Sequence, residues 1–288
     1  MRPSTRLKSI ANEKRAVVVP GTANALFARV IADIGFEALY LTGAGVANMR
    51  LGVPDVGLVT MSEMADTIWP IVDVVNLPVI VDADTGYGNA LNLYRTVRLF
   101  ERAGAAGIQI EDQVFPKKCG HFEGKAVISL PEMVQKIHAA VDARHDQDIQ
   151  IIARTDAIAV DGLDAAIERG QAFAEAGADI IFVEAPTTAE QMARIAKDID
   201  RPHIANVVFG GKTPELGREK FEELGFSLIL YANAALQASL KAVIDTMTLL
   251  NSNGALQNAN ATLASFEQRQ GAVDKARWDA LDAKYAQL

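Results

Sequence analysis

The chain has 288 residues, half of them hydrophobic, with a net charge of −8 and one cysteine. Its length suits one α/β barrel or two ordinary domains. The acidic balance argues against nucleic acid or an anionic membrane as the main partner, and a single cysteine excludes an internal disulfide framework. The opening segment "MRPSTRLKSIANEKRA" does not resemble a signal peptide, and no stretch approaches the roughly 20 apolar residues of a membrane helix. We therefore expect a soluble, cytoplasmic protein.

Short runs rich in β-branched residues recur along the chain and predict strands. Between them lie segments of helical spacing, such as "LNLYRTVRLFERAG", "LDAAIERGQAFAEAG" and "TAEQMARIAKDI". Several helical segments close on a glycine, where a left-handed helix cap is expected, at Gly35, Gly104, Gly177 and Gly225. In chain order, the eight predicted strands cover residues 17–19, 38–41, 79–81, 107–110, 149–153, 180–183, 203–206 and 227–231.

Near-continuous apolar strands that alternate with helices indicate a parallel sheet buried on both faces. Eight such units favour a closed (β/α)8 barrel, a TIM barrel of the α/β class, over an open sheet. An open, doubly wound sheet would place a GxGxxG turn after its first strand, and "GAGVAN" at 43–48 matches that motif only in part. We predict a single barrel domain over residues 1–288, in which 232–288 include a C-terminal helical extension.

The extension begins with a long predicted helix, "NAALQASLKAVIDTMTLL" at 233–250, and continues with Trp278, Leu281 and Tyr285 at helical spacing. A barrel does not need such a tail. An apolar stripe with no core left to cover commonly packs on another subunit, so we expect an oligomer. The alternative is a tail folded back on its own barrel.

In barrel enzymes, the C-terminal ends of the strands and the loops after them carry function. Candidate site residues occupy these positions throughout the chain. In chain order they are Tyr40, Thr42, Gly43, Ala44 and Asp55 after the second strand, Asp82 and Asp84 after the third, Glu111 and Asp112 after the fourth, Arg154 and Asp156 after the fifth, Glu184 after the sixth and Asn206 after the seventh.

A metal site is expected among the acids. Asp82 and Asp84 are two residues apart, so they share one face if the strand persists. With Glu111 they would place three carboxylates in one mouth, where they repel each other unless a cation neutralises them. Mg2+, with Mn2+ as an alternative, binds oxygen ligands of this kind. The other interpretation is that these acids cap helices or pair with surface Lys and Arg.

Two further features suit an anionic substrate. Arg154, at the end of "IQIIAR", fits a bidentate clamp for a carboxylate, although a structural ion pair with Glu184 is the alternative. Thr42, Gly43 and Ala44 offer backbone N–H groups at a tight turn, a position where glycine is also common for steric reasons alone.

The only cysteine, Cys119, lies in "EDQVFPKKCGH", beside Lys117, Lys118 and His121. Nearby positive charge lowers the pKa of a thiol and suits it to proton transfer or to attack. A mobile loop that presents an acid to a closed site fits this segment, and a covalent hydrolase with His121 as base stays open. The alternative is a small buried apolar filler.

At these residues the sequence resembles the isocitrate lyase and phosphoenolpyruvate mutase superfamily over nearly the whole chain. The matching segments are "YLTGAGVANMRLGVPD", "VDADTGYGN", "IEDQVFPKKCGH", "IIARTDA", "FVEAP" and "ANVVFGGKTP". The "KKCGH" loop is the most specific of them and looks like the catalytic loop of the carbon–carbon lyase branch.

The resemblance implies roles for these residues. Asp82, Asp84 and Glu111 would hold Mg2+ directly or through water, with Asp55 nearby. Thr42, Gly43, Ala44 and Arg154 would bind the 2-oxo-acid portion of the substrate. Glu184 and Asn206 would line the site, and Lys117, Cys119 and His121 would arrive on a gating loop. Family members are typically homotetramers in which a C-terminal helix swaps between subunits.

The implied reaction is a retro-aldol-type cleavage of a 2-hydroxy dicarboxylate or tricarboxylate bound to Mg2+. Cys119 is the expected proton donor to the leaving carboxylate, and Tyr40 or a metal-linked water are candidates for the base. Apolar Val207, Val208 and Phe209, together with Ala44 in place of a family glycine, favour a substrate with an apolar substituent, such as 2,3-dimethylmalate. Alternatives are methylisocitrate lyase, oxaloacetate hydrolase and carboxyphosphonoenolpyruvate phosphonomutase.

Two hypotheses from other functional classes remain open. A hydrolase that uses Cys119 covalently predicts metal-independent activity and inactivation by alkylation. A noncatalytic metabolite-binding barrel predicts Mg2+-dependent binding of carboxylates without turnover.

Overall fold

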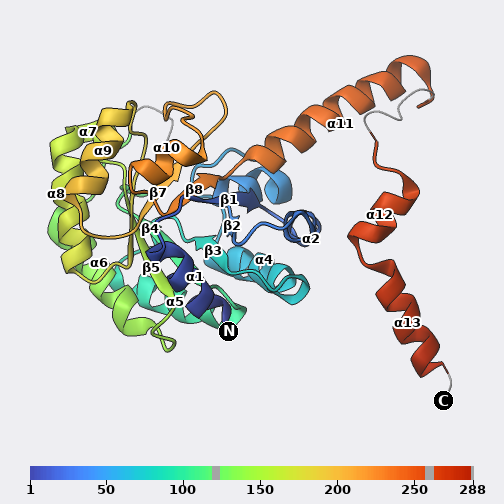
Figure 1. The fold of residues 1–288 in the computed structure, drawn as a ribbon, viewed down its shortest axis with the longest axis horizontal. Coiled ribbons are helices and arrows are strands. Elements are labelled where there is room, and N and C mark those ends of the chain that lie inside the picture. Colours follow the sequence, from blue (N-terminus) through green and yellow to red (C-terminus); the bar gives the residue numbers. More distant parts are fainter. Residues whose placement is uncertain (119–123, 257–262, 287–288) are drawn as a thin grey trace.

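The computed structural model describes residues 1–118, 124–256 and 263–286. Eight parallel strands form a closed barrel in which each strand pairs with the next and β1 pairs with β8, which confirms the (β/α)8 prediction (Figure 1). Every predicted strand is present. The strands are β1 Val17–Thr22, β2 Leu39–Leu41, β3 Val79–Asp82, β4 Gly107–Glu111, β5 Gln150–Thr155, β6 Ile180–Val183, β7 His203–Asn206 and β8 Leu228–Tyr231.

Helices surround the barrel and extend its C-terminus (Figure 1). They are α1 Pro3–Asn12, α2 Ala25–Ile34, α3 Gly43–Val46, the π-helix η1 Ala47–Leu51, α4 Met61–Val74, α5 Ala90–Ala103, α6 Leu130–Ala143, α7 Ile158–Asp161, α8 Leu163–Glu175, α9 Ala189–Asp198, α10 Arg218–Glu223, α11 Ala234–Asn253, α12 Phe266–Ala272 and α13 Lys275–Tyr285. The glycines predicted as helix caps, at 35, 104, 177 and 225, all adopt positive φ.

The sequence of α1 explains why it covers the N-terminal end of the barrel. Leu7 and Ile10 are buried and join the cluster of side chains that fills the barrel interior. On its polar side, Lys8 and Thr5 both donate to Asp148, in the segment before β5. The N-terminal end of the barrel is therefore closed, and the opposite end is left for a site.

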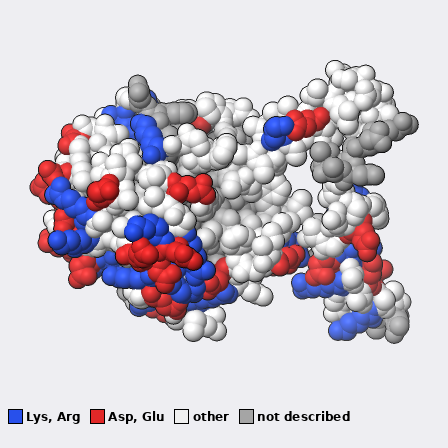
Figure 2. Space-filling model, turned by 45° about the horizontal axis from the view of Figure 1, so that its top comes forward, with Lys and Arg blue, Asp and Glu red and all other residues white. Residues whose placement is uncertain are grey.

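The C-terminal helices behave differently from the barrel helices. In Figure 1, α11 leaves the barrel and α12 and α13 continue beyond it, with α12 contacting α2. Apolar side chains along α11 are about half exposed, namely Leu240, Val243, Ile244 and Met247. Its only charged side chains are Lys241 and Asp245, which form an ion pair with each other, and the part of the molecule that projects from the barrel toward the C-terminal helices is mostly white in Figure 2. Such a helix has an apolar face that this chain leaves uncovered.

Among the described residues, none of the helices combines the length and the apolar character that crossing a membrane would require.

Candidate active site

The C-terminal ends of the strands bring most of the predicted site residues together around one cavity of about 40 Å³. Leu230 and Ala232, from β8 and the residues after it, add an apolar wall, and Asn233 adds an amide. The lining residues predicted from the sequence are Tyr40, Thr42, Ala44, Asp55, Asp82, Glu111, Lys117, Arg154, Glu184 and Asn206, with Val208 beside them.

Asp82 and Asp84 meet in this mouth through a turn and not through strand alternation. Strand β3 ends at Asp82, and Asp84 has a left-handed backbone with φ of 48°. The Asp84 N–H donates to Asp82 Oδ1 at 3.1 Å, and the Gly43 N–H donates to Asp82 Oδ2 at 3.2 Å. The shared strand face was expected only if the strand persisted, and β3 ends before Asp84. The turn itself brings the two carboxylates together.

The acids of the mouth are buried and incompletely hydrogen-bonded. Burial raises the pKa of Asp84 to about 7 although Lys117 opposes the shift, and burial also raises the pKa of Glu111 against the effect of Arg154. Within the described part of the chain, Asp84 Oδ1 and Glu111 Oε1 accept no hydrogen bond. These oxygens would gain most from a cation.

Lys117 supplies a positive charge to the same acids. Its ammonium, with a side chain only 4% exposed, pairs with Asp55 and lies 2.8 Å from Asp84 Oδ1. That second contact is an ion pair by distance, without the alignment of a hydrogen bond. Burial alone would lower the pKa of Lys117, but Asp84, Glu111, Asp82 and Asp55 together raise it well above its usual value. Lys117 therefore stays charged.

Arg154 is held chiefly by Asp156. Its Nε donates to Asp156 Oδ2 at 2.8 Å and its Nη2 to Asp156 Oδ1 at 3.1 Å. Its Nη1 lies 3.6 Å from Glu184 Oε2, and the guanidinium stacks over Phe182 at 5.2 Å. One edge of the guanidinium is thus already occupied by the carboxylate of Asp156. The ion pair with Glu184, the structural alternative raised from the sequence, is present but is the longer contact.

Tyr40 and the turn after β2 are engaged within the protein. The Tyr40 hydroxyl donates to Gln109 Oε1 at 2.7 Å, and Gln109 in turn donates to Asp82 at 3.3 Å. Burial raises the pKa of Tyr40 well above its usual value, which favours a neutral hydroxyl over a base. Thr42 accepts from the Gly45 N–H and so caps α3.

Sequence reasoning missed Gln109 and Asn233 as parts of the mouth and gave Asp156 no role. A signal for Gln109 existed, because it is a polar residue inside the otherwise apolar run "GIQI". Such a residue in a buried strand must find polar partners.

The apolar segment after β7 differs from the expectation in part. Val208 lines the mouth. Val207 instead packs in a separate core cluster with Phe221 and Phe226, and Phe209 is 86% exposed. The prediction that Val207, Val208 and Phe209 together shape the site was therefore wrong for Val207 and Phe209. Successive residues of the chain point in different directions.

Cys119 and His121 lie outside the described residues. The chain on either side of them forms two adjacent arms. The Val114 N–H donates to Ala126 O, and Lys118 Nζ donates to Gly124 O, each at 2.8 Å. The outgoing arm carries Lys117 into the mouth, and the returning arm carries Lys125.

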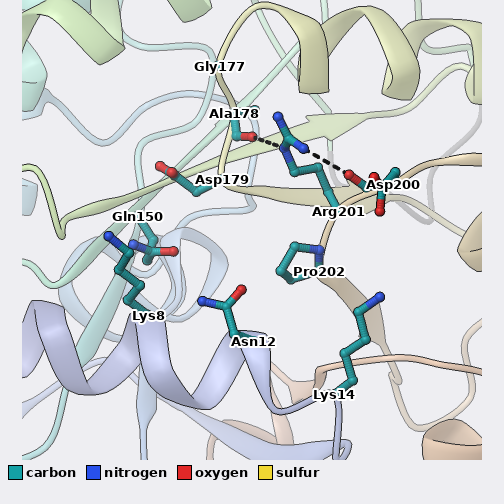
Figure 3. Close-up of a pocket in the computed structure, with 10 residues that line it drawn as sticks. All are labelled: Lys8, Asn12, Lys14, Gln150, Gly177, Ala178, Asp179, Asp200, Arg201 and Pro202. Atoms are coloured by element: carbon teal, nitrogen blue, oxygen red, sulfur yellow. Dashed lines mark hydrogen bonds between the residues drawn. The ribbon is translucent and has the colours of Figure 1, made fainter.

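A separate cavity of about 370 Å³ lies at the N-terminal end of the barrel, between α1, the start of β5 and the segments before β6 and β7 (Figure 3). Its charged groups are largely engaged by the protein itself. Arg201 donates to the carbonyls of Ala174, Ala178 and Asp200, and Lys8 pairs with Asp148. We assign no ligand to this cavity.

Comparison with known proteins defines the class. The family model described as phosphoenolpyruvate phosphomutase matches residues 7–250. The chain is 46% identical to 2,3-dimethylmalate lyase of Eubacterium barkeri over 93% of each chain. It is 50% identical to 2-methylisocitrate lyase of Aeropyrum pernix over 84% of this chain and 77% of the relative.

Solved structures agree with these relatives. A crystal structure of 2,3-dimethylmalate lyase superposes with a TM-score of 0.93 at 33% identity, covering 99% of this chain and 96% of the other. Phosphonopyruvate hydrolase in complex with oxalate and Mg2+ superposes with a TM-score of 0.89 at 29% identity, covering 99% and 100%. The chain belongs to the phosphoenolpyruvate mutase and isocitrate lyase superfamily. It is an enzyme of the carbon–carbon lyase class within it.

Proposed function

We propose that the protein is a Mg2+-dependent lyase that cleaves a 2-hydroxy dicarboxylate resembling 2,3-dimethylmalate to pyruvate and a short carboxylate. One observation carries this proposal. Two buried carboxylates, each with an oxygen that accepts no hydrogen bond from the described residues, lie in the same mouth as a buried arginine, in a chain that resembles lyases of such substrates.

The residues present fit a hard divalent cation. Asp84 Oδ1 and Glu111 Oε1 are buried oxygens that accept no hydrogen bond from any described residue. In the part of the chain that the structure describes, no three acidic or histidine side chains are close enough to form a complete ligand set. Mg2+ does not need one, because it commonly takes one or two carboxylates and keeps several waters. Asp82, Asp84 and Glu111 would hold it directly or through water, with Mn2+ as a substitute.

When bound, Mg2+ would act as a Lewis acid on the oxygens of the 2-hydroxy-acid portion. Residues of the chain would bind and orient the substrate. Arg154, with the turn at Thr42, Gly43 and Ala44, binds the carboxylate of that portion. Glu184 and Asn206 line the site, and Asp55 holds Lys117 near the acids.

Cys119 is the proposed acid that protonates the leaving carboxylate fragment, with Lys117 and His121 from the same segment as the positive charge beside it. Tyr40 suits a hydrogen-bond donor through its neutral hydroxyl. The base that removes the hydroxyl proton is left unassigned.

The apolar wall of Val208, Leu230 and Ala232 supports a small substituted malate over a tricarboxylate. An added carboxylate on the leaving fragment would lose hydration against such a wall, which opposes its binding there. The second candidate is methylisocitrate lyase, supported by the similarity to the enzyme of Aeropyrum pernix.

We further propose a cytoplasmic homotetramer in which the C-terminal helices are exchanged between subunits. The projecting α11, with its half-exposed Leu240, Val243 and Met247, supports this arrangement. Beside it lies a cavity of about 550 Å³ between η1 and α11 that includes Met49, Leu240 and Val243. A second subunit would cover these apolar surfaces.

The proposal is tested by following pyruvate release from 2,3-dimethylmalate in Mg2+ buffer and again with EDTA. We expect turnover with Mg2+ and its loss with EDTA. Asp82→Ala should abolish the Mg2+-dependent activity, and unchanged metal affinity in that variant would count against the metal assignment.

A further inference from the structure

We propose that Lys125 is a positioning residue, which acts through Asp156 to hold Arg154 in the orientation that receives a substrate carboxylate. The inference rests on the proposed function, in which Arg154 binds that carboxylate. It concerns a residue on the returning arm beyond Cys119, whose side chain does not line the mouth.

Consecutive hydrogen bonds connect Lys125 to Asp156 and Asp156 to Arg154. Lys125 Nζ donates to Asp156 Oδ1 at 2.6 Å. The same oxygen accepts from Arg154 Nη2 at 3.1 Å, and the other oxygen of Asp156 accepts from Arg154 Nε at 2.8 Å. Asp156 thus binds Lys125 on one side and one edge of the guanidinium on the other, and Arg154 Nη1 is left on the side of Glu184.

Burial strengthens these hydrogen bonds. The Lys125 side chain is 1% exposed, and the Asp156 side chain is fully buried. Burial by itself would raise the pKa of Asp156, but Arg154 and Lys125 together hold the pKa below its usual value. Asp156 therefore stays charged, and charge-assisted hydrogen bonds between buried groups fix geometry better than exposed ones do.

The backbone of Asp156 is fixed separately. Its N–H donates to Asp112 Oδ1 at 3.0 Å, and Arg169 and Thr155 both donate to Asp112 Oδ2. Loss of Lys125 would therefore leave the carboxylate of Asp156 in place with one fewer cation. Arg154 would then face Asp156, Glu111 and Glu184 with one fewer cation at Asp156. The electrostatic potential at Arg154 would become less positive. Its guanidinium would also be held less firmly in the orientation that receives a carboxylate.

Lys125 could act by positioning Arg154 or by its positive charge alone. These two roles predict opposite results for Asp156→Asn. If Lys125 acts only by its positive charge, removal of the negative charge of Asp156 should strengthen the binding of an anion. If Lys125 acts by positioning, Asp156→Asn should weaken anion binding as Lys125→Met does, because Arg154 loses its charged partner. The double variant should then bind no more weakly than Asp156→Asn alone.

The experiment measures pyruvate binding to the full chain by calorimetry in Mg2+ buffer. We expect Lys125→Met to weaken binding about tenfold or more, Lys125→Arg to restore most of it, and Asp156→Asn to weaken it too. Lys220→Met, which removes an exposed lysine paired with Glu223 on α10, is the matched control and should bind like the wild type. Circular dichroism and thermal melting establish that each variant is folded.

Failure of the wild type to bind pyruvate would overturn the proposed function and this inference with it. A wild type that binds, with unchanged affinity in folded Lys125→Met, would overturn the inference alone. Tighter binding by Asp156→Asn would also overturn it, since charge without positioning would then be enough.

Discussion

Buried charges in the barrel mouth are stabilised mainly by one another. Lys117 pairs with Asp55 and Asp84, Arg154 pairs with Asp156, and two acid oxygens are left without a hydrogen bond in the described residues. A carboxylate in this setting is costly to bury unless a cation completes its surroundings. In the proposed function, this excess of acid would receive the metal, and it is not a source of stability.

Cys119→Ser tests the role of the thiol. We expect Mg2+ and pyruvate binding to stay close to the wild type and turnover to fall by orders of magnitude, because a hydroxyl is a far weaker acid than a thiol. Calorimetry gives the binding, and a stopped assay of pyruvate release gives the turnover. Full activity of the variant would remove the thiol from the mechanism, and alkylation that inactivates a metal-independent reaction would favour a covalent hydrolase.

The buried histidine of β7 should make stability depend on pH. His203 in β7 is 1% exposed, its Nε2 donates to Ile199 O at 3.0 Å, and burial lowers its pKa to about 4. Above about pH 6.5 neither state binds the proton, so the stabilising effect of a neutral His203 is complete. As the pH falls from 6.5 to 4 only the unfolded state takes up the proton, and the free energy of unfolding drops by up to about 3 kcal/mol.

Urea unfolding at several pH values checks this expectation. His203→Gln should flatten the slope of unfolding free energy against pH between 4 and 6.5, whatever its effect on stability at neutral pH. His138→Gln, at an exposed position of α6, controls for the loss of an imidazole. An unchanged slope in His203→Gln would contradict the assignment.

At the scale of the elements, the alternation of apolar strands with amphipathic helices was enough to predict the barrel. All eight strands lie where the sequence places them, because short, near-continuous apolar runs rich in β-branched residues are typical of strands buried on both faces of a parallel sheet. The site was predictable to the extent that it depends on strand ends. The turn at Asp84 and the directions of Val207 and Phe209 were not, since local backbone geometry decides them.

The pairing of Asp156 with both Arg154 and Lys125 was likewise beyond the sequence. The two partners of Asp156 are 29 residues apart in the chain, at 125 and 154, and only the fold brings them together. Gln109 marks the opposite case, in which a polar residue in a buried strand was a usable signal.

The seam where the barrel closes depends on Gly21 of β1. A side-chain carbon there would lie 1.9 Å from the Ala232 carbonyl oxygen, which belongs to the backbone after β8. We expect Gly21→Ala to lower the free energy of unfolding by about 1–3 kcal/mol or more, because backbone must move. Gly271→Ala in α12 has open space around it and should be neutral or slightly stabilising. Equal stability of the two variants in chemical denaturation would contradict this account of the seam.

At the scale of the whole molecule, the uncovered apolar face of α11 is the feature that a single chain does not explain. A chain ending at Gly254 keeps α11 and removes α12 and α13. If those helices are exchanged between subunits, this truncation should convert the proposed tetramer to a smaller species. Light scattering after size exclusion measures the mass of both chains, and a full-length monomer would contradict the assembly.

The central claim is the cleavage of a small substituted malate, and product release from a panel of substrates tests it most directly. The panel contains 2,3-dimethylmalate, 2-methylisocitrate, isocitrate, malates and oxaloacetate, each with Mg2+ and with EDTA. We expect Mg2+-dependent pyruvate from 2,3-dimethylmalate and little or none from the tricarboxylates. Pyruvate from 2-methylisocitrate instead, or oxalate and acetate from oxaloacetate with no malate cleaved, would contradict it.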